Sequence, residues 1–169
     1  MDFALGVLFL MASLGAGQLA RDGSHVRTMD VNLRAEIDDG LTRSPYFRQL
    51  VARLDASDVI VYVQTECAMS SRLFGRLTFM SAAGGRRYVS VHVSCAMSET
   101  QQIAAIGHEL RHAVEIADAS SVRDEATLAA EYQRIGFESH AVRKGTGYES
   151  RAAIEATQRV WEELNRRGE

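Results

Sequence analysis

Apolar residues recur every three or four positions over residues 103–118. This period places them on one face of an amphipathic helix. Ser98 precedes the stretch and is followed three residues later by Gln101, a capping-box pattern that is typical of a helix start. The apolar face consists of Ile103, Ile106, Leu110, Val114 and Ala117. We therefore expect a helix with one buried face in this part of the chain.

The same spacing predicts helices elsewhere. Asp30 and Ser44 are residue types that favour the position before a helix, and Pro45 suits the first helical position, so one helix is expected after each cap. Another helix is expected to end at Gly136, and a last one to cover residues 150–166. The apolar stripe of the last helix, which we assign to the core, consists of Ala153, Ile154, Thr157, Val160, Trp161 and Leu164.

Three other stretches are rich in β-branched residues or alternate between apolar and polar ones. Residues 58–64 indicate a buried strand. Residues 76–82 and 87–94 indicate two strands joined by a hairpin turn at Gly84 and Gly85. The pattern as a whole predicts an α+β domain. We expect a small, mostly antiparallel three-stranded sheet, with the helix over 103–118 packed on it and the other helices flanking it.

Composition narrows the class of protein. The chain has 169 residues, 46% of them hydrophobic, and a formal net charge of −3. These values are typical of one globular domain, here residues 26–169. Because there is no basic excess, nucleic acid is not an expected partner. Residues 3–16 form an apolar run, but a membrane helix needs about 20 such residues, so no stable membrane span is expected.

Residues 1–20, which contain this run, indicate either a signal peptide or an N-terminal hydrophobic helix. The run fits the apolar region of a secretory signal, although Asp2 precedes it and no Lys or Arg does. We expect export to the periplasm or the extracellular space. Cys67 and Cys95 follow the first and third predicted strands. In an oxidising compartment they can form a disulfide, and the alternative is a pair of buried thiols.

The helix over 103–118 carries the string His108-Glu109-Leu110-Arg111-His112. Residues four apart share a helix face, so both imidazole rings project the same way, one turn apart. Two ring nitrogens bind one zinc ion at this spacing, and Glu109 lies beside them. A carboxylate there can accept a proton from a water that the ion has made more acidic. The string therefore predicts a metal-dependent hydrolase.

The string resembles the H-E-x-x-H signature of the zincin metallopeptidases, a resemblance that covers this helix. It implies that His108 and His112 are zinc ligands, that Glu109 is the general base, and that the substrate is a peptide or protein. It also implies a third protein ligand. The metzincin continuation of the signature is absent, because Glu115 and Asp118 stand where its glycine and third histidine would be.

In the gluzincin-like form of the family, the third ligand is a glutamate on a later helix. Glu149 is our choice, because it lies between a Gly-rich loop and the last predicted helix. Glu115 is the alternative ligand. On a continuous helix it lies about 10 Å along the axis from His108, at about 1.5 Å per residue. We therefore expect Glu115 to accept a hydrogen bond from the ring of His112 instead.

These expectations combine into one hypothesis, a small exported zinc metallopeptidase with a minimal zincin-like fold. Two alternatives stay open. One is a zinc-binding domain in which the metal has a structural or sensing role, since the chain is short and supplies no separate specificity lobe. The other is a metal-free exported interaction domain, in which the helix over 103–118 is only scaffold.

Overall fold

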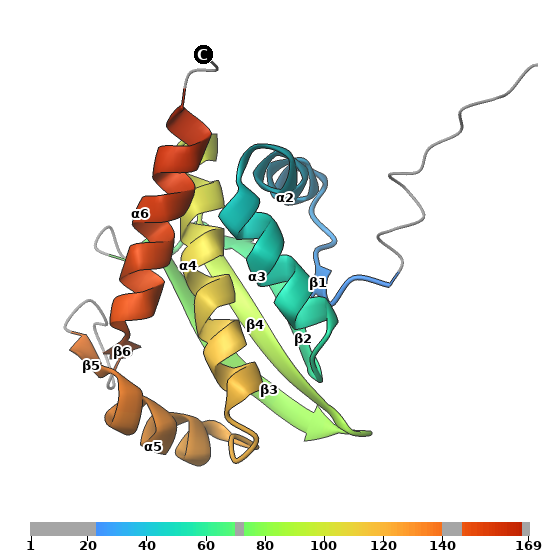
Figure 1. Ribbon diagram of the computed structural model, residues 1–169, viewed down its shortest axis with the longest axis vertical. Helices are drawn as coiled ribbons and strands as arrows, with labels where there is room; N and C mark the ends of the chain where they lie inside the picture. Colours follow the sequence, from blue (N-terminus) through green and yellow to red (C-terminus); the bar gives the residue numbers. More distant parts are fainter. Residues whose placement is uncertain (1–22, 70–72, 140–146, 167–169) are drawn as a thin grey trace, which may run out of the picture.

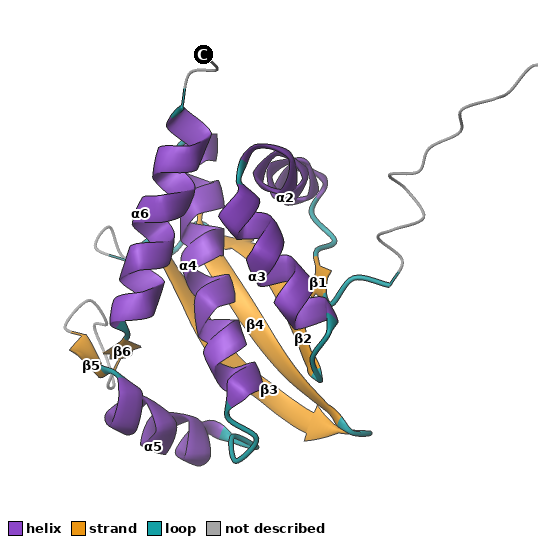
Figure 2. Ribbon diagram, viewed as in Figure 1, coloured by secondary structure: helices purple, strands orange, loops and turns teal. Residues whose placement is uncertain are grey.

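A computed structural model of the protein describes residues 23–69, 73–139 and 147–166. The predicted signal peptide at residues 1–20 lies outside these ranges. The helices are α2 (Val31–Arg43), α3 (Pro45–Asp55), α4 (Glu99–Asp118), α5 (Glu125–Ile135) and α6 (Arg151–Asn165). The strands are β1 (Val26–Arg27), β2 (Val59–Glu66), β3 (Gly75–Ala83), β4 (Arg86–Ser94), β5 (Phe137–Ser139) and β6 (Gly147–Glu149). The α+β class is confirmed (Figures 1 and 2).

The predicted helix starts after Asp30 and Ser44 are confirmed. Asp30 Oδ1 accepts a hydrogen bond from the backbone N–H of Asn32 at 2.8 Å, before the first turn of α2. Ser44 Oγ accepts one from the backbone N–H of Phe47 at 3.0 Å, with Pro45 as the first residue of α3. Each cap satisfies an N–H group that has no partner within its helix.

The expectation of a mostly antiparallel three-stranded sheet is wrong. The main sheet is mixed and has four strands in the order β1-β2-β4-β3. The predicted hairpin of β3 and β4 is present and antiparallel, with Gly84 and Gly85 at positive φ in its turn. However, β4 inserts beside β2 and runs parallel to it, and the two-residue strand β1 adds a second parallel pair. After β2 the chain forms β3 at the far edge of the sheet, and it then returns as β4 between β3 and β2.

The helices lie on one face of this sheet, as Figures 1 and 2 show. Alternate residues of the two central strands point to that face and are at most 1% exposed. They are Val59, Val61 and Val63 of β2 and Val89, Val91 and Val93 of β4. α3 and α4 pack on this face, and α6 packs against α4 as an outer element. No helix in the described ranges combines the length and the apolar character needed to cross a membrane.

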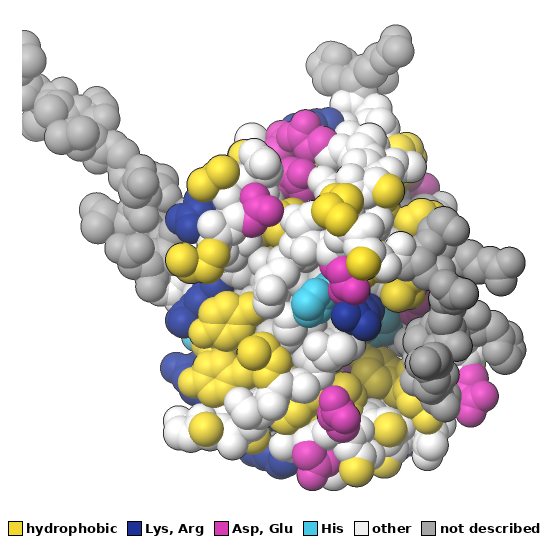
Figure 3. All heavy atoms as spheres, turned by 180° about the vertical axis from the view of Figure 1, so that it is seen from behind, with side chains coloured by type: hydrophobic (Ala, Val, Ile, Leu, Met, Phe, Trp, Pro, Cys, Tyr) yellow, Lys and Arg dark blue, Asp and Glu magenta, His cyan; other side chains and the backbone are white. Residues whose placement is uncertain are grey.

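The opposite face of the sheet carries the alternate side chains of β2 and β4, several of them polar. Gln64 donates a hydrogen bond to Ser90 Oγ at 3.2 Å, and His92 Nδ1 lies 3.2 Å from a carboxylate oxygen of Glu66. Seen from behind, this side of the molecule also shows a patch of hydrophobic side chains among charged ones (Figure 3). His92 thus lies on the face away from α4.

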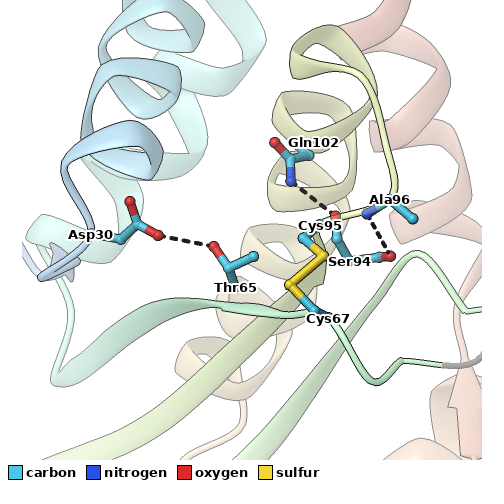
Figure 4. Close-up of a disulfide and its surroundings, with 7 residues drawn as sticks. All are labelled: Asp30, Thr65, Cys67, Ser94, Cys95, Ala96 and Gln102. Atoms are coloured by element: carbon cyan, nitrogen blue, oxygen red, sulfur yellow. Dashed lines mark hydrogen bonds between the residues drawn. A yellow bond between two sulfur atoms is a disulfide. The ribbon is translucent and has the colours of Figure 1, made fainter.

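Cys67 and Cys95 form a disulfide that links the ends of β2 and β4, which decides between the two alternatives for this pair (Figure 4). Their Cα atoms are 5.0 Å apart. Beside the disulfide, Gln102 of α4 donates a hydrogen bond to the backbone carbonyl of Ser94 at 2.9 Å. The carboxyl ends of the central strands are therefore tied to each other and to the first half of α4.

Candidate metal centre

α4, the helix predicted over 103–118, is held at its N-terminal end by the expected capping box. The backbone N–H of Ser98 donates a hydrogen bond to Gln101 Oε1 at 2.9 Å. The apolar face of α4 is buried as predicted, with Ile103, Ile106 and Leu110 all 0% exposed. Because this face is fixed against the sheet, the position of the motif side chains is fixed as well.

Arg87 of β4 holds the other end of α4. Its side chain is buried and donates hydrogen bonds to the carbonyl oxygens of Ile116 at 2.5 Å and Ala119 at 2.7 Å. It also pairs with Asp58 through two contacts, of 2.6 and 2.9 Å. A cation at a helix C-terminus satisfies carbonyl groups that have no partner within the helix. Arg87 thus joins the sheet to the end of the motif helix.

His108 and His112 lie one turn apart on α4, with ring centroids 4.9 Å apart. Glu149, the last residue of β6, reaches both rings. Its Oε2 lies 3.2 Å from Nε2 of His108, and its Oε1 lies 3.3 Å from Nε2 of His112. One donor atom from each of the three residues lies within 4.8 Å of the other two. The structure therefore brings together the two histidines of the motif and the glutamate chosen as third ligand.

The ring of His108 is oriented by Thr157 of α6. Thr157 Oγ1 lies 2.8 Å from Nδ1 of His108, and its hydroxyl donates to the carbonyl of Ala153 at 3.2 Å. Since the hydroxyl proton points to Ala153, the Thr157 oxygen is an acceptor for an N–H on Nδ1. Nε2 is therefore the ring nitrogen that faces Glu149 and that would bind a metal when it carries no proton.

The ring of His112 is oriented in the same sense. Its Nδ1 lies 2.9 Å from Glu115 Oε2 and 2.9 Å from the hydroxyl of Tyr132 on α5. The carboxylate accepts the Nδ1 proton, so Nε2 is the nitrogen that faces Glu149 and that would bind a metal after losing its own proton. The expected contact between Glu115 and His112 is therefore present. Glu115 contacts the ring nitrogen on the side away from Glu149.

Ser150 connects these contacts to the start of α6. Its Oγ accepts a hydrogen bond from the backbone N–H of Ala153 at 3.1 Å and donates one to Glu115 Oε1 at 2.7 Å. Its backbone N–H donates to Glu149 Oε1 at 2.8 Å. The residue that caps α6 thus holds both glutamates of the site.

Opposite charges dominate the electrostatics of the cluster. Burial alone lowers the pKa of His112, but its hydrogen bonds to Glu115 and Glu149 outweigh burial and raise the pKa to about 9. Burial raises the pKa of Glu149, but hydrogen bonds from the rings of His108 and His112 hold it well below its usual range. The space between the carboxylate and the rings therefore favours positive charge.

Glu109 directly follows His108 on α4, and its side chain is 4% exposed. Burial raises the pKa of its carboxyl, against the attraction of His108 and His112. Gly75, the first residue of β3, makes room for it. A Cβ atom on Gly75 would lie 2.7 Å from Glu109 Oε1, closer than real contacts allow.

A cavity of about 1040 Å³ opens over the cluster. His108, Glu109, His112 and Glu149 all line it. The remaining walls come from β3 and the residues just before it, from Met97 and the first half of α4, from β5 and β6, and from parts of α5 and α6. This volume lies just above the usual range for small-molecule sites, about 300–1,000 Å³, and it is large enough for several residues of an extended peptide.

The donor set of the cluster fits zinc. Zinc in proteins takes imidazole nitrogens and carboxylate oxygens in a tetrahedral arrangement, with bonds of about 2.0–2.1 Å. Two ligand atoms of such a tetrahedron lie about 3.3 Å apart. The Nε2-to-carboxylate separations are 3.2 and 3.3 Å, to different oxygens of Glu149. Each histidine thus lies at this spacing from the glutamate, while the three donor atoms as a set lie within 4.8 Å of one another.

One sequence expectation beside the site is wrong. The sequence pattern assigns Ile154 and Trp161 to the core stripe of α6, but they are 47% and 41% exposed and line the cavity. Ala153, Val160 and Leu164 of the stripe are buried, and Thr157 is partly exposed and also lines the cavity. Periodicity identifies an apolar stripe but does not show that part of it faces a cavity.

Sequence reasoning did not find four residues that shape the site: Gly75, Tyr132, Ser150 and Thr157. Each acts across a tertiary contact, for which the sequence carries no local signal. The Gly-rich loop expected before Glu149 lies partly outside the described residues, and its two ends pair as β5 and β6. Comparison with models of protein families, with curated proteins and with solved structures gives no match to this chain.

Proposed function

We propose that this protein is a zinc-dependent hydrolase that cleaves peptide bonds. The observation that carries the proposal is the convergence of two imidazole Nε2 atoms and one carboxylate, all lining one cavity. Each Nδ1 atom is engaged on the opposite side, by Thr157 or by Glu115. Such outer contacts orient the histidine ligands of metal sites and fix which nitrogen faces the ion.

His108, His112 and Glu149 would hold the metal. Bound zinc supplies Lewis acidity, which makes water more acidic and stabilises the negative charge that develops on a carbonyl oxygen. Glu109 accepts a proton from the attacking water while the water oxygen adds to the carbonyl carbon. When the C–N bond breaks, Glu109 returns that proton to the leaving amine. The buried position of Glu109 on the cavity wall keeps bulk water from competing for the proton.

The position of β3 favours an extended substrate. β3 is the outer strand of the four-stranded sheet, and its residues from Gly75 to Phe79 line the cavity. The backbone groups on the free edge of such a strand can pair with a peptide in an extended conformation. A peptide bound in this way would pass directly over Glu109, because Gly75 and the Glu109 carboxylate are in close contact.

The variant Glu109→Gln tests the proposal. It keeps the shape of the side chain but removes the group that accepts the proton. We expect zinc content to stay at one ion per chain, while the rate of hydrolysis of a quenched-fluorescent peptide pool falls by about 10²- to 10⁴-fold. Both quantities are measured on the same purified protein, by elemental mass spectrometry and by fluorescence.

Glu155→Gln is the matched control, because Glu155 is an exposed glutamate of α6. This variant should keep both zinc and activity. A wild-type protein that binds zinc but hydrolyses no peptide would instead support the non-catalytic zinc-binding domain. Unchanged hydrolysis in Glu109→Gln would contradict the proposed role of Glu109.

A further inference from the structure

Large apolar side chains are left exposed on one part of the cavity wall. Phe74, Ile154 and Trp161 are 61%, 47% and 41% exposed, and all three line the cavity. Met97, in the loop before α4, adds a fourth apolar side chain. Exposed apolar groups that gather in a concave site are typical of ligand-binding surfaces. We refer to these four residues as the apolar end of the cavity.

Contacts between elements place Trp161, Phe74 and Met97 of the apolar end beside the N-terminal half of α4, whereas Ile154 lies on the other side of Thr157. α6 runs antiparallel to α4, since Ser150 contacts Glu115 whereas Thr157 contacts His108. Trp161, one turn further along α6, therefore lies beside the residues of α4 that precede His108.

Phe74 belongs to the same end of the cavity. Its carbonyl accepts a hydrogen bond from the backbone N–H of Ser94 at 3.0 Å, and the carbonyl of Ser94 accepts one from Gln102 near the start of α4. Two separate walls, the chain before β3 and the helix α6, thus present apolar side chains to the same space.

The apolar end is close to the candidate metal centre. Ile154 and Trp161 flank Thr157, which contacts His108, and each is about one helical turn from it, or about 5 Å along the axis. One residue of an extended peptide spans about 3.3 Å. A side chain bound at the apolar end therefore belongs to a residue one or two positions from the group held at His108.

The lining of this end is uncharged. Among the described residues that line it from α6, from the first half of α4 and from positions 73 and 74, none is charged, and the polar ones include Gln101 and Gln158. Transfer of a carboxylate or ammonium group into such surroundings without a partner is unfavourable. An apolar side chain gains free energy in proportion to the area that it buries. The lining thus favours apolar side chains over charged ones.

We infer that the apolar end is a specificity subsite that takes a bulky apolar side chain, aromatic or branched aliphatic, next to the peptide bond to be cleaved. This inference rests on the proposed function. It names the class of substrate, namely extended peptides with a large apolar residue beside the scissile bond. Apolar pockets of this kind discriminate by size, because each buried methylene adds to affinity.

The test uses three small chelating probes, the hydroxamates of N-acetyl-phenylalanine, N-acetyl-glycine and N-acetyl-aspartate. The hydroxamate group binds zinc in each, and only the side chain differs. Affinity for the zinc-loaded protein is measured by calorimetry. Trp161 is the only tryptophan of the chain, so its fluorescence reports separately whether the apolar end is occupied. We expect the phenylalanine probe to bind at least about tenfold more tightly than the glycine probe, and the aspartate probe to show no gain.

Ile154→Ala should reduce the preference for the phenylalanine probe several-fold and leave the affinity of the glycine probe unchanged. Met80→Ala is the control, because Met80 is an exposed residue of β3 that lines a different hollow. Equal affinity for the phenylalanine and glycine probes, with zinc bound, would overturn the subsite alone. A protein that retains no zinc and binds none of the probes would overturn the proposed function, and the subsite with it.

Discussion

Gly75 has no side chain, and this leaves room for the carboxylate of Glu109. A Cβ atom there would meet the carboxylate end of Glu109, with Oε1 at 2.7 Å and Cγ at 3.1 Å. The end of a flexible side chain can move aside at small cost, so the fold would accept an alanine. The Glu109 carboxylate, however, would be displaced from the position in which it can accept a proton from the attacking water.

We therefore expect Gly75→Ala to lower kcat/KM for peptide hydrolysis by about 10- to 100-fold, since a displacement of about 1 Å has effects of this size. Its free energy of unfolding should change by less than about 1 kcal/mol, and its zinc content should not change. Gly23→Ala is the control, because no atom lies within 4 Å of the added Cβ. Loss of zinc in Gly75→Ala would contradict a role limited to Glu109.

Glu36 of α2 makes stability depend on pH, away from the metal centre. Burial, together with the negative charges of Glu99 and Asp30, raises its pKa from 4.5 to about 7. Between these two values the folded protein keeps a proton that the unfolded chain has lost. The free energy of unfolding therefore falls as the pH rises from about 4.5 to about 7, and this loss is absent below pH 4.5.

Glu36→Gln removes this titration. Relative to the wild type, the variant should gain about 1–2 kcal/mol in free energy of unfolding between pH 5 and pH 8. Urea denaturation of both proteins at pH 5 and pH 8 measures the difference in free energy of unfolding between variant and wild type. Contributions from other titrating groups cancel in this difference. A difference between the two proteins that is the same at pH 5 and pH 8 would contradict the raised pKa of Glu36.

At the scale of elements, the contact between α4 and the sheet depends on Arg87. Its buried guanidinium pairs with Asp58 and binds the last carbonyls of α4. Arg87→Ala leaves these carbonyls and the carboxylate without their partner, and we expect a loss of about 3–5 kcal/mol in free energy of unfolding.

Arg53 also pairs with the end of α4, at Asp118, but both side chains are 55% exposed. Arg53→Ala should therefore lose less than about 1 kcal/mol. Equal losses in urea denaturation would show that Arg87 does not hold the helix.

The elements themselves were largely predictable from the sequence, because their signals are local. The caps at Asp30, Ser44 and Ser98 lie within a few residues of the groups that they satisfy. Strand pairing is not local. The alternation in β4 is compatible with an antiparallel or a parallel neighbour, and the two residues of β1 are too few to show a period. The mixed order of the sheet could therefore not be read from the sequence.

At the scale of the whole molecule, some parts of the candidate site follow from local sequence signals and others depend on contacts between distant elements. The spacing of His108 and His112 is a property of one helix and was predictable. The partners of their rings come from α5 and α6, where Tyr132 and Thr157 reach across to α4. Glu149 was chosen by resemblance, and it reaches both rings because Ser150 caps α6 and binds Glu115 at the same time. The site thus depends on the packing of α4 against the C-terminal part of the chain.

The central claim is that His108, His112 and Glu149 together bind one zinc ion. The most direct test is the zinc content, by elemental mass spectrometry, of wild-type protein and of Glu149→Ala, both loaded with zinc and dialysed against the same buffer. The account predicts one zinc per chain in the wild type and a large loss in the variant. No zinc in the wild type, or full retention in Glu149→Ala, would contradict it.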